Sequence, residues 1–474
     1  MTRAALPSRT RRLQHIALAL GVLAIAATPA GAISKEQERP LRIAILTDCK
    51  GPFPDGWESA IGGAQAAFYE HAGARPVDRG KPSAGMVGGR IAGRAIDIRY
   101  GCGDASAATA VKEASRLVEG WGADVLIGPL SGDEAAAIAR YAKRHPDRTF
   151  VIGTAASQAP TLEIGPRNLF RYHGDGAQWN AGLGEIAYKK LGWRRAAIVV
   201  DDYSFGWTSA AGIIADFCAI GGRIVERVFP PLGTLDYATY VRELPPPDRV
   251  DGYFWVVGGT GTGPALQAFE QRFGPVTPTQ HSGNVFFAFL FPETGIRDFP
   301  GITRRLVGAY AGGIGTAPGL RTRQARAYEA TIERWHPDLP AAVGYVYNYY
   351  NAAWATIRGL RASGGKVGPA LLRAMPKTSK SGYEASDGGL VQLDQNRQAI
   401  QDQHPLRAVQ GRDGKVTLRV IGMVPNVDQS FGGVFTRTGP APSRTYPRCE
   451  KRRLRWQGKI REVRGGVITS RVLG

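Results

Sequence analysis

Short apolar runs alternate with helical patterns over the first 290 residues of this chain, and this alternation restricts the folds that the chain can adopt. Apolar runs of this length, bounded by turn residues, are typical of buried strands, and the stretches between them have the spacing of helices. Strands that alternate with helices are typical of parallel, doubly wound sheets. The predicted strands lie at residues 42–46, 95–100, 124–128, 149–154, 195–202, 223–229 and 252–257.

The helical patterns fall between these strands, and the alternation restarts near residue 178. Two successive βα series in a chain of 474 residues predict two α/β domains. The predicted helices lie near 60–71 and at 105–121, 133–143, 178–191, 207–219, 236–244 and 264–273. Farther along we expect a strand within 304–313, a long helix over 341–363, and strands within 388–400 and 416–424. Loops are expected at 72–94, 245–247, 364–382 and 438–447.

The N-terminus has the pattern of a secretory signal peptide. Four arginines precede an apolar stretch at 16–27, which is followed by the small residues Ala30-Gly31-Ala32. The apolar stretch is too short to span a membrane. We therefore expect residues 1–32 to be removed after Ala32 and the protein to be exported.

The charge is strongly positive, with a formal net charge of +20, and much of the excess lies near the C-terminus. Residues 444–474 contain ten Lys and Arg against Glu450 and Glu462. A high positive charge can indicate nucleic-acid binding, but an exported chain without a nucleic-acid motif is not expected to have such a partner. A solvated basic tail, on the surface or near anionic lipid, is the expected structure.

Four cysteines remain after the signal peptide, namely Cys49, Cys102, Cys218 and Cys449. An even number in an oxidising compartment favours disulfides, and four cysteines allow three pairings. Cys49 and Cys102 each follow a predicted strand, and neighbouring parallel strands would bring these two ends together. This favours Cys49–Cys102 and, by elimination, Cys218–Cys449. No C-x-x-C is present and the histidines are scattered, so we expect no metal site.

The loops after the predicted strands suggest a pocket for a small organic molecule. Open parallel sheets bind ligands beyond the carboxyl ends of their strands. These loops are rich in Gly, Ser and Thr and carry aromatic residues, a composition that suits such a pocket. They lie at 47–57, 128–134, 153–162, 201–209, 258–264 and 281–287, and their aromatic residues are Phe53, Trp57, Tyr203, Phe205, Trp207 and Phe286.

Within the loop at 128–134, Ser131 and Glu134 have the S-x-x-E spacing of a capping box. Helix capping alone accounts for both residues. The same helix start would also present the Ser131 hydroxyl and the N–H groups of Gly132 and Asp133 to a ligand carboxylate.

The motifs of common cofactor and enzyme sites are missing. Gly259, Gly261 and Gly263 alternate and do not have the G-x-G-x-x-G spacing of a dinucleotide turn. The sequence has no G-x-S-x-G, no H-E-x-x-H and no P-loop. We therefore expect no cofactor and no enzymatic activity.

The chain resembles the type I periplasmic solute-binding proteins of ABC importers, in the branch that binds branched-chain amino acids (Leu/Ile/Val). The similarity extends over about 41–435 and includes the segments "DVLIGPLSG", "GTAASQAPTL" and "GGLVQLDQNRQAI". The resemblance implies two doubly wound α/β lobes, three hinge crossovers, and a solute trapped between the lobes by hinge closure. It places the crossovers near 168–174, 308–314 and 404–410. It assigns 41–168 and 312–405 to lobe 1, 169–311 and 406–437 to lobe 2, and 438–474 to a basic extension.

The resemblance also implies a set of ligand-binding residues. The turns Leu130-Ser131-Gly132 and Ala155-Ala156-Ser157 correspond to family segments that hold the carboxylate and amino group of an amino acid. Phe205 matches an aromatic residue against the ligand, and Thr260 lies in the corresponding loop of the second lobe. Tyr203 and Trp207 are added because they are close to Phe205 in sequence.

One position departs from the amino-acid binders. Where they carry an acidic residue that pairs with the ligand's ammonium, this chain has Asn284. Burying an ammonium without a carboxylate is costly. Either Asp175 provides that carboxylate, or the ligand is not an α-amino acid, in which case the aromatic loops favour a carboxylate-bearing aromatic or other apolar solute.

We therefore expect a monomeric periplasmic protein that captures a small organic solute and delivers it to an ABC permease in the inner membrane. The alternative is a ligand-sensing subunit of a membrane receptor, which would have the same fold. An exported enzyme would need Ser131 or Ser157 as a nucleophile beside an acid such as Asp133, but no histidine is placed by sequence to activate either serine.

Overall fold

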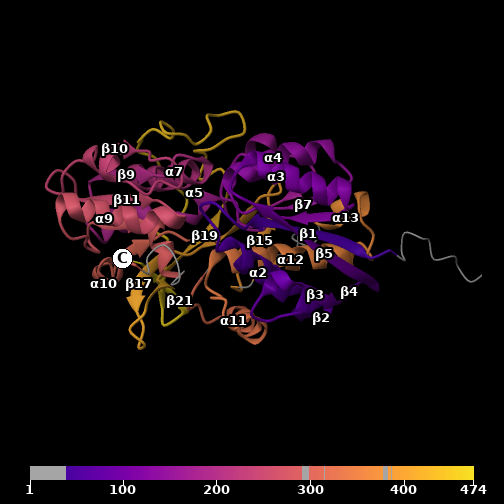
Figure 1. Cartoon of the computed structure of the whole chain (residues 1–474). Coiled ribbons are helices and arrows are strands. Elements are labelled where there is room, and N and C mark those ends of the chain that lie inside the picture. The colour runs from indigo at the N-terminus through magenta and orange to yellow at the C-terminus, as the bar shows by residue number, and fades with distance from the viewer. Residues whose placement is uncertain are drawn as a thin grey trace, which may run out of the picture.

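The computed structural model describes residues 39–290, 298–313, 315, 317–376, 383–385 and 387–473. Two α/β lobes lie side by side, and each is built on its own largely parallel sheet (Figure 1). This is the predicted fold class. The predicted signal peptide, residues 1–32, lies outside the described residues. Among the described helices, none has the length and apolarity needed to cross a membrane.

The sheet of the first lobe has six strands in the order β4-β5-β1-β6-β7-β8. All neighbours are parallel except the β4–β5 hairpin. Alternate residues of β1 enter different cores: Ile43 and Ile45 pack with α2 and α12, whereas Ala44 and Leu46 pack with α3 and α4. The strands are β4 Arg90–Ile91, β5 Arg94–Gly103, β1 Leu41–Asp48, β6 Val125–Ile127, β7 Thr149–Val151 and β8 Leu169–Phe170. The helices are α2 Gly56–Ala72, α3 Ala107–Ser115, α4 Gly132–Arg144, α12 Gly344–Ala362 and α13 Pro369–Ala374.

The sheet of the second lobe has the order β10-β9-β11-β12-β13-β17-β18, in which β17 and β18 are antiparallel additions to a parallel sheet. Ile198 and Phe254 pack against α7 on one face, and Val199 and Trp255 pack against α9 on the other. The strands are β10 Arg223–Val228, β9 Arg195–Val200, β11 Gly252–Val256, β12 His281–Gly283, β13 Tyr310–Ala311, β17 Leu406–Gln410 and β18 Val416–Val420. The helices are α5 Gly176–Trp179, α6 Leu183–Lys189, α7 Ser204–Ala219, α8 Ala238–Arg242, α9 Thr262–Phe273 and α10 Pro300–Arg305.

A third sheet, which the sequence did not predict, has the antiparallel order β14-β15-β16-β19-β20-β21. Its strands come from all three predicted parts of the chain: β14, β15 and β16 from lobe 1, β19 from lobe 2, and β20 and β21 from the extension. The predicted lobe boundaries therefore stay a prediction for the C-terminal part of the chain. The strands are β14 Tyr383–Glu384, β15 Leu390–Leu393, β16 Ala399–Gln403, β19 Gly422–Val427, β20 Arg461–Arg464 and β21 Val467–Val472.

Several local predictions differ from the structure. The helix predicted over 178–191 is interrupted between α5 and α6, where Gly182 has a φ of +87°. The first part of the strand predicted over 304–313 belongs to α10, which starts with Pro300, a residue that favours the first turn of a helix. The predicted loops at 72–94 and 364–382 contain the short strands β2 Ala74–Pro76 and β3 Met86–Gly88 and the helix α13, and α11 Arg323–Trp335 was not predicted.

The C-terminal segment is packed against the second lobe, so the prediction of a solvated tail is wrong. Leu454, Trp456 and Ile460 are buried, and β20 pairs with β19. The apolar residues alternate with exposed basic ones, and this lets one side of the segment pack while the other faces water.

Both predicted disulfides are confirmed. Cys49–Cys102 joins the ends of β1 and β5, where Thr47 and Cys102 are partners in the parallel register. Cys218–Cys449 joins α7 to the C-terminal segment.

Candidate solute-binding site

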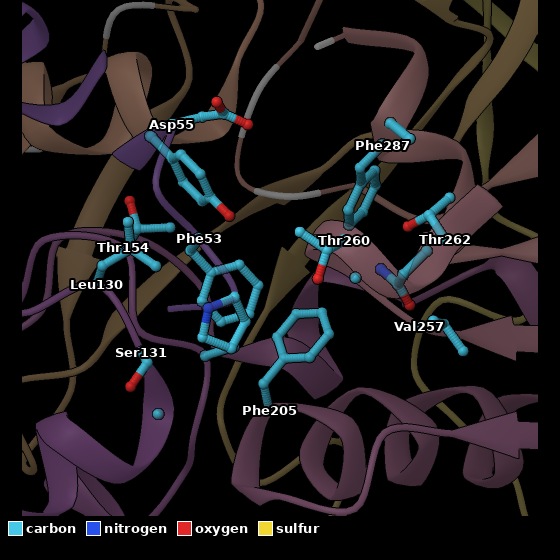
Figure 2. A pocket seen from close by; sticks show the side chains of 18 of the residues that line it. Phe53, Asp55, Leu130, Ser131, Thr154, Phe205, Val257, Thr260, Thr262 and Phe287 are labelled. Atoms are coloured by element: carbon cyan, nitrogen blue, oxygen red, sulfur yellow. The ribbon is translucent and has the colours of Figure 1, made fainter. Parts of the chain in front are cut away.

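A pocket lies where the loops at the carboxyl ends of the two parallel sheets face each other (Figure 2). The first lobe contributes loops that follow β1, β6 and β7, and the second lobe contributes loops that follow β9, β11 and β12. The cavity volume is about 110 Å³. A cavity of about 150 Å³ is known to hold benzene, so this smaller pocket suits a solute no larger than about one ring or a short branched chain.

Aromatic side chains from both lobes line part of the wall. In Figure 2, Phe53, Phe205 and Phe287 surround a central space beside Thr260. The ring of Tyr203 lies 6.4 Å from that of Phe53 and 5.7 Å from that of Phe205, measured between centroids. Tyr345, from α12, also lines the pocket. An apolar ring or chain would therefore find aromatic faces from both lobes.

The N-terminus of α4 borders the same space. The Ser131 N–H donates to Glu134 Oε2 at 3.1 Å, which is one half of the predicted capping box, and the Ser131 hydroxyl donates to the Ala105 carbonyl at 3.4 Å. The start of a helix carries a partial positive charge and N–H groups without helical partners. This side of the pocket is suited to an anionic group.

The two lobes touch beside the pocket. A Cβ added to Gly132 on α4 would lie 2.3 Å from Ser204 Oγ and 3.2 Å from the backbone nitrogen of Phe205, both on α7. A Cβ added to Gly259 in the second lobe would lie 2.4 Å from the Pro52 carbonyl in the first. At Gly259, which has a φ of +57°, the contact is with backbone, so this approach requires glycine.

Two buried carboxyl groups lie behind the α4 N-terminus. A Cβ on Gly103 would lie 2.5 Å from Asp48 Oδ1 and 2.5 Å from Glu134 Oε1, so both groups adjoin the same residue. Burial raises the pKa of Asp48 to about 6. Burial, and then the charge of Asp48, raises the pKa of Glu134 well above its ordinary value. The pair therefore retains a proton where two carboxylates would repel each other.

Asn284 provides a polar group at the second-lobe side of the pocket. Its side chain is buried, and neither its amide oxygen nor its amide nitrogen has a hydrogen-bond partner among the described residues. An amide can donate and accept. Buried polar groups normally have partners, so a bound solute would complete the hydrogen bonding of this residue.

Asp175 does not line the pocket. Its Oδ1 accepts from the N–H groups of Ala177 and Gln178, at 3.0 Å each, and so caps α5. Its Oδ2 lies 3.1 Å from Gln429 Nε2 and 3.8 Å from Arg171 Nη2. The carboxylate is thus part of a buried network between β8 and α5 and does not line the pocket.

Eight of the predicted ligand-binding residues line the pocket and four do not. Besides Asp175, the exceptions are Ala155 and Ser157, whose carbonyls accept from Arg171 Nη1, and Trp207, whose indole N–H donates to Asp202. The eight that line the pocket are Leu130, Ser131, Gly132, Ala156, Tyr203, Phe205, Thr260 and Asn284.

The structure adds pocket residues that the sequence did not predict as ligand-binding. Phe53 lies in a loop that the sequence had singled out, but Tyr345 lies in α12, where nothing in the sequence marks a site. Asp55 is the only residue with a carboxylate among the described residues that line this pocket. In the part of the chain that the structure describes, no cluster of three or more His, Cys, Asp or Glu side chains could hold a metal ion.

Comparisons with known proteins agree with this architecture. The model of the periplasmic binding protein family matches residues 40–415. No curated protein matches the chain. An ABC transporter substrate-binding protein from Sphaerobacter thermophilus is similar in structure, with 23% identity and a TM-score of 0.65 over 82% of this chain and 99% of that one.

Two other similar structures differ in their ligands. A solute-binding protein from Rhodopseudomonas palustris in complex with p-hydroxybenzoic acid has 19% identity and a TM-score of 0.67, over 82% of this chain and 98% of that one. A leucine-binding protein from Thermotoga maritima has 17% identity and a TM-score of 0.62, over 80% and 98%. These are binding proteins and not enzymes, in agreement with the expectation from the sequence.

Proposed function

The chain belongs to the periplasmic binding protein family, and we propose that it is the substrate-binding component of an ABC importer whose solute carries a carboxylate on an aromatic or other apolar body. The solute lies between the lobes, which close on it by a hinge motion, and the closed protein delivers it to the permease. The lobe contacts at Gly132 and Gly259 are consistent with a closed arrangement.

The observation that carries this proposal is the set of polar groups at the pocket. An α-amino acid needs a carboxylate for its ammonium, but the corresponding position holds Asn284, and Asp175 is occupied as a helix cap. The N-terminus of α4 remains for a solute carboxylate, and the rings of Phe53, Tyr203 and Phe205 remain for its apolar body. The p-hydroxybenzoic acid complex of a protein with the same fold supports this class of solute.

An α-amino acid is the second candidate. Asp55 supports it, because it contributes a carboxylate to the pocket lining. The leucine-binding protein with the same fold is consistent with this candidate as well.

Thermal-shift and calorimetric titrations separate the two candidates, after removal of copurified solute by partial unfolding and dialysis. The panel pairs 4-hydroxybenzoate and benzoate with leucine, phenylalanine, benzamide and benzylamine. A solute at 100 times its Kd adds about 2.7 kcal/mol to the free energy of unfolding. We expect stabilisation by the aromatic acids and none by benzylamine. Stabilisation by leucine alone contradicts the proposal.

Asn284→Asp provides an independent test. The added carboxylate faces the pocket, so it should weaken binding of an aromatic acid by roughly 10- to 100-fold through like-charge repulsion and should favour a solute with an ammonium. Asn426→Asp is the control, because it makes the same change at an exposed position. Unchanged affinity in Asn284→Asp would mean that Asn284 does not face the solute.

A further inference from the structure

We propose that a basic surface on the second lobe binds anionic phospholipid headgroups and so holds the protein at the membrane that contains its permease. This lobe-2 basic surface consists of Lys190, Arg194, Arg448, Lys451, Arg453 and Lys459. Four of the six lie in the C-terminal segment, beyond the part of the chain that the family model matches. The proposal does not depend on the class of solute.

The C-terminal part of this surface is fixed on the lobe. Cys449 is linked to Cys218 of α7, and the Arg452 N–H donates to the Ala219 carbonyl at 3.2 Å. The Trp456 indole N–H donates to Asp216 at 2.9 Å. The Gly458 N–H donates to Glu185 of α6 at 2.9 Å. These contacts hold residues 449–458 along α6 and α7.

The remaining part of the surface comes from α6 and the residues after it. A Cβ on Gly221 would lie 3.4 Å from Lys451 Cε and 3.7 Å from the Tyr188 hydroxyl, so Lys451 and Tyr188 are neighbours. The Arg194 guanidinium lies over the Tyr188 ring at 3.7 Å. Lys190 follows directly at the end of α6. Cations that are far apart in the sequence therefore meet here.

The two segments that form this surface contain few acidic groups, and from outside them Asp251 adjoins Arg194, whose backbone N–H donates to Asp251 Oδ2 at 2.7 Å. Residues 185–195 and 448–459 contain ten Lys and Arg and two Glu. Both glutamates are already paired, Glu185 with Lys189 and Glu450 with Arg452. The six cations of the lobe-2 basic surface are exposed and form no ion pair with a carboxylate that the structure describes. Exposed cations without a carboxylate partner attract anions over about a Debye length.

The surface favours lipid over an acidic protein as its partner. Protein interfaces have an apolar core, and none of the exposed large apolar residues, Val77, Val87, Leu235, Val467 and Val472, lies in these two segments. Headgroups require only charge, and Lys and Arg near an anionic membrane surface contribute additively to binding. Binding of this kind is reversible and sensitive to salt, as suits a carrier that moves along a membrane.

The test is co-sedimentation of the purified protein with vesicles of phosphatidylcholine containing about 30 mol% phosphatidylglycerol, at low and at high salt. We expect binding to these vesicles, little binding to pure phosphatidylcholine, and loss of binding at high salt. The triple variant Lys190→Gln, Lys451→Gln, Arg453→Gln should bind about 100-fold more weakly.

The matched control removes three exposed cations from the first lobe, by Lys112→Gln, Arg140→Gln and Lys143→Gln, and so changes the net charge equally. It should retain vesicle binding. Equal weakening in both triple variants would overturn the proposal, since net charge would then explain the binding. No binding to anionic vesicles would also overturn it, as would binding to polyglutamate without binding to vesicles, which would indicate an acidic protein partner. Solute affinity should be unchanged in both variants, so failure here is distinct from failure of the proposed function.

Discussion

At the scale of single residues, Ser131 tests whether the start of α4 binds solute or only caps a helix. If its hydroxyl meets a charged group of the solute, Ser131→Ala should weaken affinity by about 1–3 kcal/mol in calorimetric titration. Ser106→Ala is the control, because Ser106 caps α3 by accepting from the Thr109 N–H at 3.2 Å and does not line the pocket. Each variant should lose about 1 kcal/mol of stability. Equal solute affinity in the two variants would leave capping as the whole role of Ser131.

The buried pair Asp48 and Glu134 makes a prediction about pH. The pKa of Asp48 is raised to about 6 by burial, so its contribution to stability is present at low pH and is lost as pH rises through 6. Asp48→Asn should therefore flatten the decline in unfolding free energy between pH 4.5 and 7.5, measured by urea denaturation. Asp248→Asn, at an exposed site, should leave the profile unchanged. If the unfolding free energy of Asp48→Asn declines with pH as steeply as that of the native protein, a group other than Asp48 titrates in this range.

At the scale of elements, the segment between β8 and α5 contains a buried ion pair. Arg171 is fully buried and donates to Ala155, Ser157 and Thr161, and Asp175 caps α5. Arg171→Met should cost about 3–5 kcal/mol, because it leaves Asp175 as an uncompensated buried charge. Adding Asp175→Asn should recover part of this loss, since the amide oxygen can still cap the helix. Urea denaturation measures the free energy of unfolding of Arg171→Met and of the double variant. If the double variant is less stable than Arg171→Met, the two side chains are not coupled.

The C-terminal segment makes a second prediction at this scale. The disulfide Cys218–Cys449 holds it on α7, so Cys218→Ser with Cys449→Ser should expose residues near 438–458 to limited proteolysis. Removing Cys49 and Cys102 in the same way is the control, because that disulfide joins β1 and β5 in the other lobe. Cleavage at the C-terminal segment in both variants would point to a general loss of stability.

At the scale of the whole molecule, the sequence predicted the parts that have a local signal. The alternation of apolar runs and helices located β1, β5, β9 and β11, and the strand ends located the first disulfide. The third sheet was missed because its local hairpins, β14-β15-β16 and β20-β21, become one sheet only through β19, which pairs with β16 and β20 across longer stretches of the chain that no local pattern reveals. Tyr345 was missed for the same reason, since α12 reaches the pocket only after the chain has returned to the first lobe.

The last prediction concerns closure, which involves both lobes at once. Gly132→Val places a side chain where α4 meets Ser204 and Phe205 of α7, so it should hinder closure. Solute affinity should fall by at least about tenfold, because the closed state becomes less populated, and small-angle scattering should show less compaction on addition of solute than in the native protein. Gly80→Ala, a change at a position with no close neighbour except Asp78, should behave like the native protein. Normal compaction and affinity in Gly132→Val would mean that the lobes do not need this contact to enclose the solute.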